Sequence, residues 1–104
     1  MLIHLVSFKY KAEVGDAAKV DHRRRLQRLA ELPVVVRLQV GADVVRSPRS
    51  YDTGLLVAFR DRAGLDAYQV DPAHVPVAQF GASLCDHIVA VDFESSDDTG
   101  SHST

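Results

Sequence analysis

The alternation of apolar and polar residues predicts four β-strands. Residues 2–10 alternate with the two-residue period of a strand, and both faces of this segment carry apolar side chains. Residues 34–45 are rich in β-branched side chains, with a bend or bulge expected at residues 41–43. Residues 52–60 and 86–93 alternate again. Apolar side chains on both faces predict strands that are covered on both sides.

The first helix is predicted between the first two strands. After a turn that ends at Asp16, a plausible N-cap, apolar residues recur at helical spacing. The helix should stop before Pro33, because the residue before a proline is disfavoured in the α region. His22 lies on the apolar stripe of this helix, where it either faces the core or reaches solvent from the edge of the stripe.

The second helical segment, from about residue 61 to Leu84, is expected to be broken. Asp61 or Asp66 can cap its start. Asp71-Pro72 then interrupts it, since proline has no amide N–H, and a new helix can begin at Pro72. The break places Tyr68 at the end of one helix and His74 in the first turn of the next.

The resulting order is strand, helix, strand, strand, helix, strand. This is the ferredoxin-like βαββαβ arrangement, an α+β fold with four antiparallel strands and helices on one face. It occupies residues 1–94, and residues 95–104 have no apolar side chain and are expected to be disordered. A monomer would leave one apolar sheet face bare, so we expect a homodimer through the sheet faces.

Composition excludes several classes of protein. The 104 residues make one domain, and the net charge of −2 gives no electrostatic case for binding nucleic acid. No apolar run approaches the roughly 18 residues of a membrane span, and no signal peptide is visible, so we expect a cytoplasmic protein without membrane contact. The single Cys85 cannot form an internal disulfide and is interpreted as a small buried residue. The arginines at positions 23–25 and 28 are interpreted as a solvated helix face, or otherwise as an anion-binding patch.

The candidate chemistry lies at the helix break. Imidazole titrates near neutral pH and a phenol can donate a proton, so His74 and Tyr68 form a usable acid/base couple. A plain structural role, with Tyr68 as a core aromatic and His74 as a surface residue, is the alternative. The 5 histidines include no pair at the i, i+4 spacing of a helical zinc site, and there is no phosphate-binding glycine loop. We therefore expect neither a metal nor a cofactor.

These motifs resemble a known family. The pattern Tyr-x-x-x-Pro-x-His at residues 68–74, the first strand at residues 3–9 and the last at residues 88–93 are similar to the stress-responsive dimeric α/β-barrel (Dabb) domain. The resemblance implies a homodimeric barrel, and its best understood members are polyketide cyclases without cofactors. In those relatives the tyrosine and histidine of this motif, here Tyr68 and His74, act as the acid/base pair.

The resemblance also implies a pocket between the sheet and the helices. The pocket-lining histidine of the family's first strand corresponds to His4. If the helices cover the strand face that holds His4, the expected substrate-binding residues are His4, Val6, Phe8, His22 and Leu55. The chain departs from the best known cyclase at Thr53 and Asp71, where that enzyme has histidines, and at His22 and Arg25, where its first helix has aromatic residues. The acid/base pair is therefore retained while the pocket wall, and with it the expected substrate, differs.

Three functions remain open at this point. The first is a cofactor-free enzyme that performs an aldol-type cyclisation, an isomerisation or an elimination on a carbonyl-rich, polyketide-like molecule. The second is a cofactor-free monooxygenase of the same fold, which is disfavoured because such enzymes often use Trp or Asn and this chain has neither. The third is a non-catalytic stress-response or ligand-binding barrel.

Overall fold

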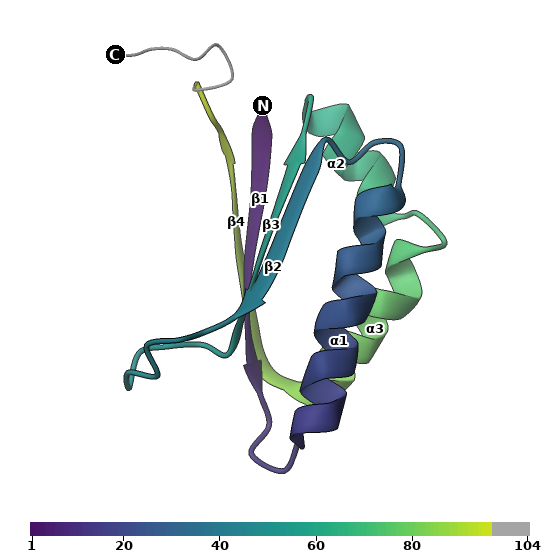
Figure 1. Ribbon diagram of the computed structural model, residues 1–104. Coiled ribbons are helices and arrows are strands. Elements are labelled where there is room, and N and C mark those ends of the chain that lie inside the picture. The colour runs from purple at the N-terminus through teal and green to yellow at the C-terminus, as the bar shows by residue number, and fades with distance from the viewer. Residues whose placement is uncertain (97–104) are drawn as a thin grey trace.

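The computed structural model describes residues 1–96 and contains one four-stranded antiparallel sheet. Its strands lie in the order β2-β3-β1-β4, with helices on one side (Figure 1). This is the ferredoxin-like βαββαβ fold that the alternation predicted. The strands are β1 (Leu2–Tyr10), β2 (Arg37–Ala42), β3 (Thr53–Phe59) and β4 (Cys85–Glu94).

Three α-helices cover one face of the sheet (Figure 1). They are α1 (Asp16–Arg28), which continues into a 3₁₀ turn (Leu29–Glu31), α2 (Arg62–Gln69) and α3 (His74–Leu84). The predicted break between α2 and α3 is present, although α3 begins at His74, two residues after Pro72. The Asp71 carboxylate accepts the Ala73 N–H at 2.8 Å, and the Asp71 carbonyl accepts the His74 N–H at 2.9 Å.

The N-terminus of α2 agrees with the prediction, and that of α1 differs by one residue. Asp61 caps α2 as expected, because its carboxylate accepts the Gly64 N–H at 3.0 Å. Asp16 was predicted as the N-cap of α1, but Gly15 occupies that position and Asp16 lies in the first turn. Its negative charge is still favourable there, next to the positive end of the helix dipole.

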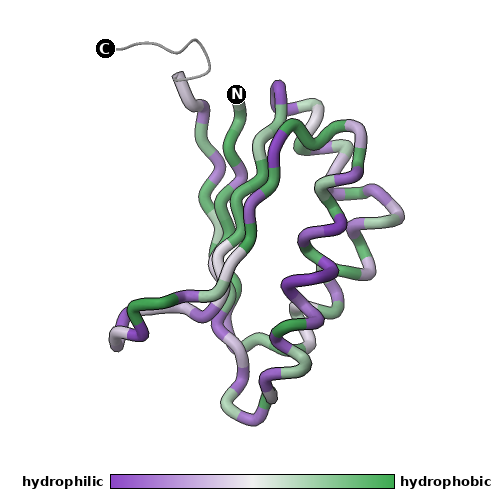
Figure 2. Tube along the Cα trace, viewed as in Figure 1, coloured by the Kyte–Doolittle hydropathy of each residue, from purple (hydrophilic) through white to green (hydrophobic). Residues whose placement is uncertain are grey.

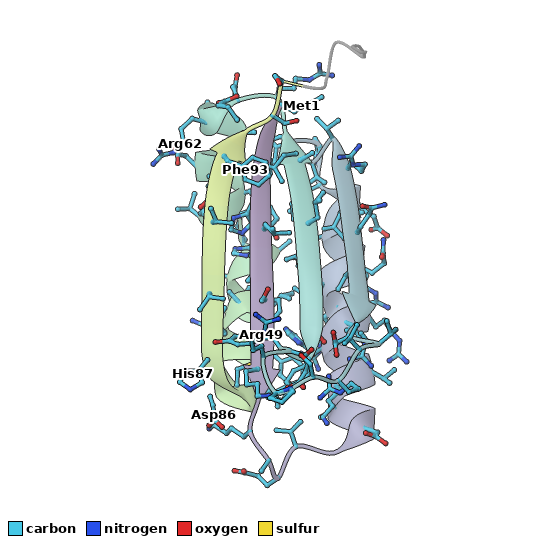
Figure 3. All side chains as sticks on the ribbon, turned by 90° about the vertical axis from the view of Figure 1, so that its left-hand side faces the viewer. Met1, Arg49, Arg62, Asp86, His87 and Phe93 are labelled. Carbon is cyan, nitrogen blue, oxygen red and sulfur yellow. The ribbon has the colours of Figure 1, made fainter. Side chains whose placement is uncertain are left out.

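The sheet has an inner face under the helices and an outer face. His4 pairs with Val57 of β3 and Asp92 of β4, so alternate residues of these strands share the inner face. The core lies there and includes Val6, Phe8, Leu26, Leu55, Val57, Phe59 and Leu65. The outer face is seen from the front in Figure 3, with Phe93 and His87 on β4. Four of its apolar side chains are exposed, namely Leu5, Val89, Val91 and Phe93.

The second strand is shorter than predicted and contains no bulge. Pairing of β2 with β3 is regular from Arg37 to Ala42, so of the bend or bulge expected at residues 41–43 the bulge is absent. The strand instead ends at Ala42. The irregularity lies instead at Lys9/Tyr10, where β1 pairs with β4. Residues 43–52, here called the arm, form an extended hairpin that projects on the outer side of the sheet (Figure 1). Hydrophobic residues continue from β2 into this arm (Figure 2).

The ends of the domain lie together on neighbouring strands. The Ser95 N–H donates to the Met1 carbonyl at 2.8 Å, so backbone pairing continues one residue beyond the predicted boundary at residue 94. The rest of the predicted disordered tail, residues 97–104, lies outside the described residues. Cys85 is buried at the start of β4, as predicted. Over residues 1–96, no helix is long and apolar enough to cross a membrane.

Candidate functional site

A cavity of about 270 Å³ lies between the inner sheet face and the helices. All seven site residues predicted from the sequence line it: His4, Val6, Phe8, His22, Leu55, Tyr68 and His74. The remaining lining residues come from α1, the α2 end, α3 and β4, namely Leu26, Gln69, Val77, Ala78, Ile88 and Ala90. The wall is therefore mostly apolar, and its polar groups are concentrated in three histidines, one tyrosine and one glutamine.

Tyr68 projects from the last turn of α2 and has no exposed surface. Its ring packs against Phe59, with centroids 5.1 Å apart, and against the edge of His4 at 6.1 Å. Within residues 1–96 its hydroxyl has no hydrogen-bond partner. Burial raises the pKa of Tyr68 to about 12, because a phenolate would be poorly solvated there. The side chain is thus a neutral phenol with a proton to donate.

His74 is the first residue of α3 and is held by a backbone carbonyl. Its Nδ1 lies 3.3 Å from the Gln69 carbonyl oxygen, which can only accept, so the proton is assigned to Nδ1 and Nε2 keeps its lone pair. Burial lowers the pKa of His74, and the nearby His4 lowers it further, against the opposing effects of the Gln69 carbonyl and Asp71. Neutral imidazole, the basic form, is therefore favoured near neutral pH.

The Tyr68 and His74 rings pack against each other in a tilted arrangement and do not hydrogen-bond to each other. Their ring centroids are 4.2 Å apart and the ring planes meet at 38°. The break at Asp71-Pro72 produces this contact, because it turns the chain between the two helices within six residues. The Gln69 carbonyl, and not the Tyr68 hydroxyl, therefore fixes the orientation of the His74 ring.

His4 makes a cross-strand pair that the sequence did not reveal. Its Nδ1 lies 2.5 Å from the Asp92 carboxylate, and the two residues are directly opposite on β1 and β4. Alternation along residues 86–93 assigns Asp92 to a strand face but gives it no partner. Its partner became identifiable only with the register of the sheet, which the separate strand patterns do not contain.

His22 is fully buried, so its alternative placement at a solvent-facing edge was wrong. Its Nδ1 lies 2.8 Å from the Tyr10 hydroxyl, which lies 2.9 Å from Thr53 Oγ1, and Arg23 donates to the same Oγ1 at 3.1 Å. Burial, together with the positive charges of Arg23 and Arg25, lowers the pKa of His22 to about 4. Its Nε2 has no hydrogen-bond partner within residues 1–96.

The arginine-rich part of α1 is only partly a solvated face. Arg23 turns inward to Thr53, and the Arg25 guanidinium lies 4.0 Å from the centre of the Phe80 ring on α3. Arg25 also pairs with Asp21 at 3.0 Å, and Arg24 lies 3.6 Å from the same carboxylate. Among residues 1–96, no group of three or more His, Cys, Asp or Glu side chains is placed to hold a metal ion.

Comparison with known proteins identifies the family. The model of the stress-responsive A/B barrel domain, Dabb, matches residues 2–95. The chain belongs to this family. No curated protein sequence matches the chain.

Several solved structures share this fold, and two of them are described as dimeric. A dimeric ferredoxin-like protein of unknown function from Jannaschia sp. CCS1 is 31% identical, with a TM-score of 0.77 over 90% of this chain and 98% of the other. A second such protein, from Thermobifida fusca YX, is 25% identical, with a TM-score of 0.81 over 88% of each chain. A hydroxynitrile lyase from Passiflora edulis shares the fold at 15% identity, with a TM-score of 0.80 over 88% of this chain and 90% of the other.

Proposed function

We propose that this Dabb protein is an acid–base catalyst that acts without a cofactor on a small, carbonyl-rich molecule. The observation that carries the proposal is the cavity that holds two complementary groups. One is a neutral imidazole whose Nδ1 is bound by the Gln69 carbonyl, and the other is a buried phenol whose hydroxyl has no partner among residues 1–96. A base and a proton donor in one apolar cavity are the requirements of proton abstraction next to a carbonyl.

In the proposed reaction, His74 Nε2 takes a proton from the carbon next to the substrate carbonyl. The electron pair of the C–H bond forms a C=C double bond, and the π electrons of the carbonyl move onto its oxygen. Tyr68 donates a hydrogen bond to the enolate oxygen that results. In a cyclisation, the enolate carbon then attacks a second carbonyl carbon and forms a C–C bond. The His74 imidazolium returns its proton to the resulting alkoxide, which restores the enzyme. Isomerisation would return the proton to a different carbon.

The substrate class follows from the wall of the cavity and from the family resemblance. Mostly apolar lining residues favour a molecule with an aliphatic or aromatic part, and about 270 Å³ limits its size. A linear polyketide-like compound meets both conditions. We also propose that the chain forms a homodimer through the outer sheet face, which the exposed Leu5, Val89, Val91 and Phe93 support.

Base function can be tested before the natural substrate is known. Acetophenone carries exchangeable protons next to its carbonyl, and their replacement by deuterium in D₂O can be followed by NMR. We expect the protein to accelerate this exchange and His74→Ala to reduce the acceleration by about 10²–10⁴-fold. Tyr68→Phe, which removes one donor to the enolate oxygen, should reduce it by about 10²–10³-fold.

The pH dependence gives the test a second readout. Only neutral His74 accepts a proton, so the exchange rate should rise with pH through a pKa below the ordinary 6.5 and be level at neutral pH. His87→Ala is the matched control, because His87 is an exposed histidine outside the cavity. Exchange that is equally fast with the protein and with its His74→Ala variant would refute the proposal.

A non-catalytic ligand-binding protein is the second candidate. Two of the three cavity histidines already have side-chain partners, His4 with Asp92 and His22 with Tyr10, as expected of a fixed binding wall. Titration with small aromatic polyketide-like ligands separates the two functions. Binding that His74→Ala or Tyr68→Phe weakens, without any acceleration of exchange by the parent protein, would favour this candidate.

A further inference from the structure

The arm, residues 43–52, carries apolar side chains into solvent. The exposed fraction is 89% for Val44 and 72% for Val45, among the highest values for large apolar residues in the described chain. The arm stands off the outer face of the sheet in Figure 1, and in the perpendicular view its Arg49 lies in front of the sheet (Figure 3). Adjacent exposed valines on a projecting hairpin are costly in water unless another surface covers them.

Side-chain interactions connect the two sides of the arm. Arg46 has a φ of 55°, a left-handed conformation that is unfavourable for a side chain of this size. Its guanidinium pairs with Asp52 at 2.7 Å and with Asp43 at 3.2 Å, and its own N–H donates to Asp43 at 2.7 Å. The Ser47 and Ser50 hydroxyls, 2.9 Å apart, close the turn at the tip. These interactions hold the two valines in a fixed position away from the domain's own core.

A groove of about 550 Å³ lies on the outer side, between the arm and the sheet. Its lining includes Leu5 of β1, Leu56 of β3, and Val44 and Tyr51 of the arm. The groove therefore joins the arm to the exposed apolar residues of the outer face. A surface that docks on this face also meets the arm.

We propose that the arm packs against a second copy of this chain and so acts as a clasp in the dimer. The inference rests on the proposed homodimer and extends it, because it assigns part of the interface to residues outside the sheet. The second copy is the expected occupant because the structural relatives are described as dimeric and the arm projects on the side of the bare apolar face. In a two-fold dimer, Val44 and Val45 of each arm pack against the partner. Each groove binds an apolar part of the partner's outer face.

The test compares two pairs of exposed valines by sedimentation equilibrium. Val44→Asp with Val45→Asp places two charges on the arm. Val20→Asp with Val70→Asp makes the same chemical change at residues that are 46% and 74% exposed on the helical side of the molecule. We expect the arm pair to raise the dimer dissociation constant at least about tenfold, since buried charges without partners are strongly disfavoured. The helical pair should leave that constant close to the parent value.

Each outcome can be interpreted. A dimeric parent whose dissociation constant is unchanged by the arm pair would overturn the clasp and leave the homodimer standing. A parent that is monomeric at micromolar concentration would overturn both. Circular dichroism checks that the arm pair is folded, and if it is not, Val44→Thr with Val45→Thr serves instead, because threonine has nearly the shape of valine. An unchanged constant in that variant would also count against the clasp.

Discussion

At the scale of single residues, burial sets the protonation of the candidate site. It raises the pKa of Tyr68 and lowers the pKa values of His22 and His74, so each of these groups is neutral near neutral pH. A cavity with an uncharged base and an uncharged acid suits proton transfer to and from a neutral carbonyl compound. Arg23 is directed toward the buried Tyr10–Thr53–His22 network instead of toward solvent, and this adds to the depression of the His22 pKa.

The buried His22 predicts a loss of stability in mild acid. Its pKa is about 4 in the folded protein, against an ordinary value of 6.5. Between these values the unfolded chain binds a proton that the folded chain does not, so the free energy of unfolding falls as the pH drops from 6.5 toward 4. At about 1.4 kcal/mol per pKa unit, the full loss is roughly 3 kcal/mol.

Denaturant unfolding at pH 7 and pH 5, at one protein concentration, measures this effect. His22→Gln keeps a polar group beside Tyr10 but does not titrate, so it should show a clearly smaller difference between the two pH values. An equal pH difference in the parent and in His22→Gln would show that His22 is not the source.

At the scale of helices and strands, close approach between α1 and α3 shapes the cavity. Gly81 of α3 lies against the His22 ring of α1, and a Cβ built at Gly81 would be 2.7 Å from His22 Nε2. The ring cannot move freely, because Phe8 and Phe80 pack against it and Tyr10 binds its other nitrogen. Because Gly81 has no side chain, the His22 ring fits between the two helices.

Gly81→Ala should destabilise the protein by about 1–3 kcal/mol, as overpacking of a filled interior usually does. Helix propensity alone acts in the opposite direction, since alanine is favoured over glycine by about 1 kcal/mol in a helix interior. Thermal unfolding measures the net effect. Gly41→Ala is the control, because a Cβ there meets nothing within 4 Å. A Gly81→Ala variant as stable as the parent would mean that the two helices separate at little cost.

At the scale of the whole molecule, the helices cover one face of the sheet and leave the other open. The outer face of β4 carries Val89, Val91 and Phe93, which are between 44% and 53% exposed. Val91 lies on this face, opposite Leu5 of β1. Such a face is too apolar to be left in water, and a second sheet is the covering that the dimeric relatives suggest.

Val91→Asp should disrupt the proposed dimer and lower the melting temperature at the same time. The new carboxylate would lie in the middle of the proposed apolar interface, and in such a dimer the folding of each chain is coupled to that burial. Sedimentation and thermal unfolding measure the two effects. Val20→Asp on α1 is the control, with a similar exposed fraction of 46% on the helical side. An intact, equally stable Val91→Asp dimer would place the interface elsewhere.

The sequence by itself determined the order and type of the elements. Strand alternation has a period of two residues and is a local property, so β1, β3 and β4 were located to within one or two residues. The helix break could also be predicted from the local sequence, because Pro72 restricts the backbone of the residues next to it. The residue spacing of the Tyr68–His74 motif, with its family resemblance, allowed both candidate residues to be named with no knowledge of their geometry.

The tertiary structure decided which groups meet. The His4–Asp92 pair, the contact of Gly81 with His22 and the cavity volume all join residues from different elements. Periodicity assigns a residue to a face but does not give the register between strands or the distance between helices. The choice between a bend and a bulge at residues 41–43 could not be made from the sequence for the same reason. A bulge is a mismatch between two strands, and the sequence of β2 alone does not specify its pairing with β3. Burial also depends on the packed whole, and it alone decided that His22 is a neutral core residue.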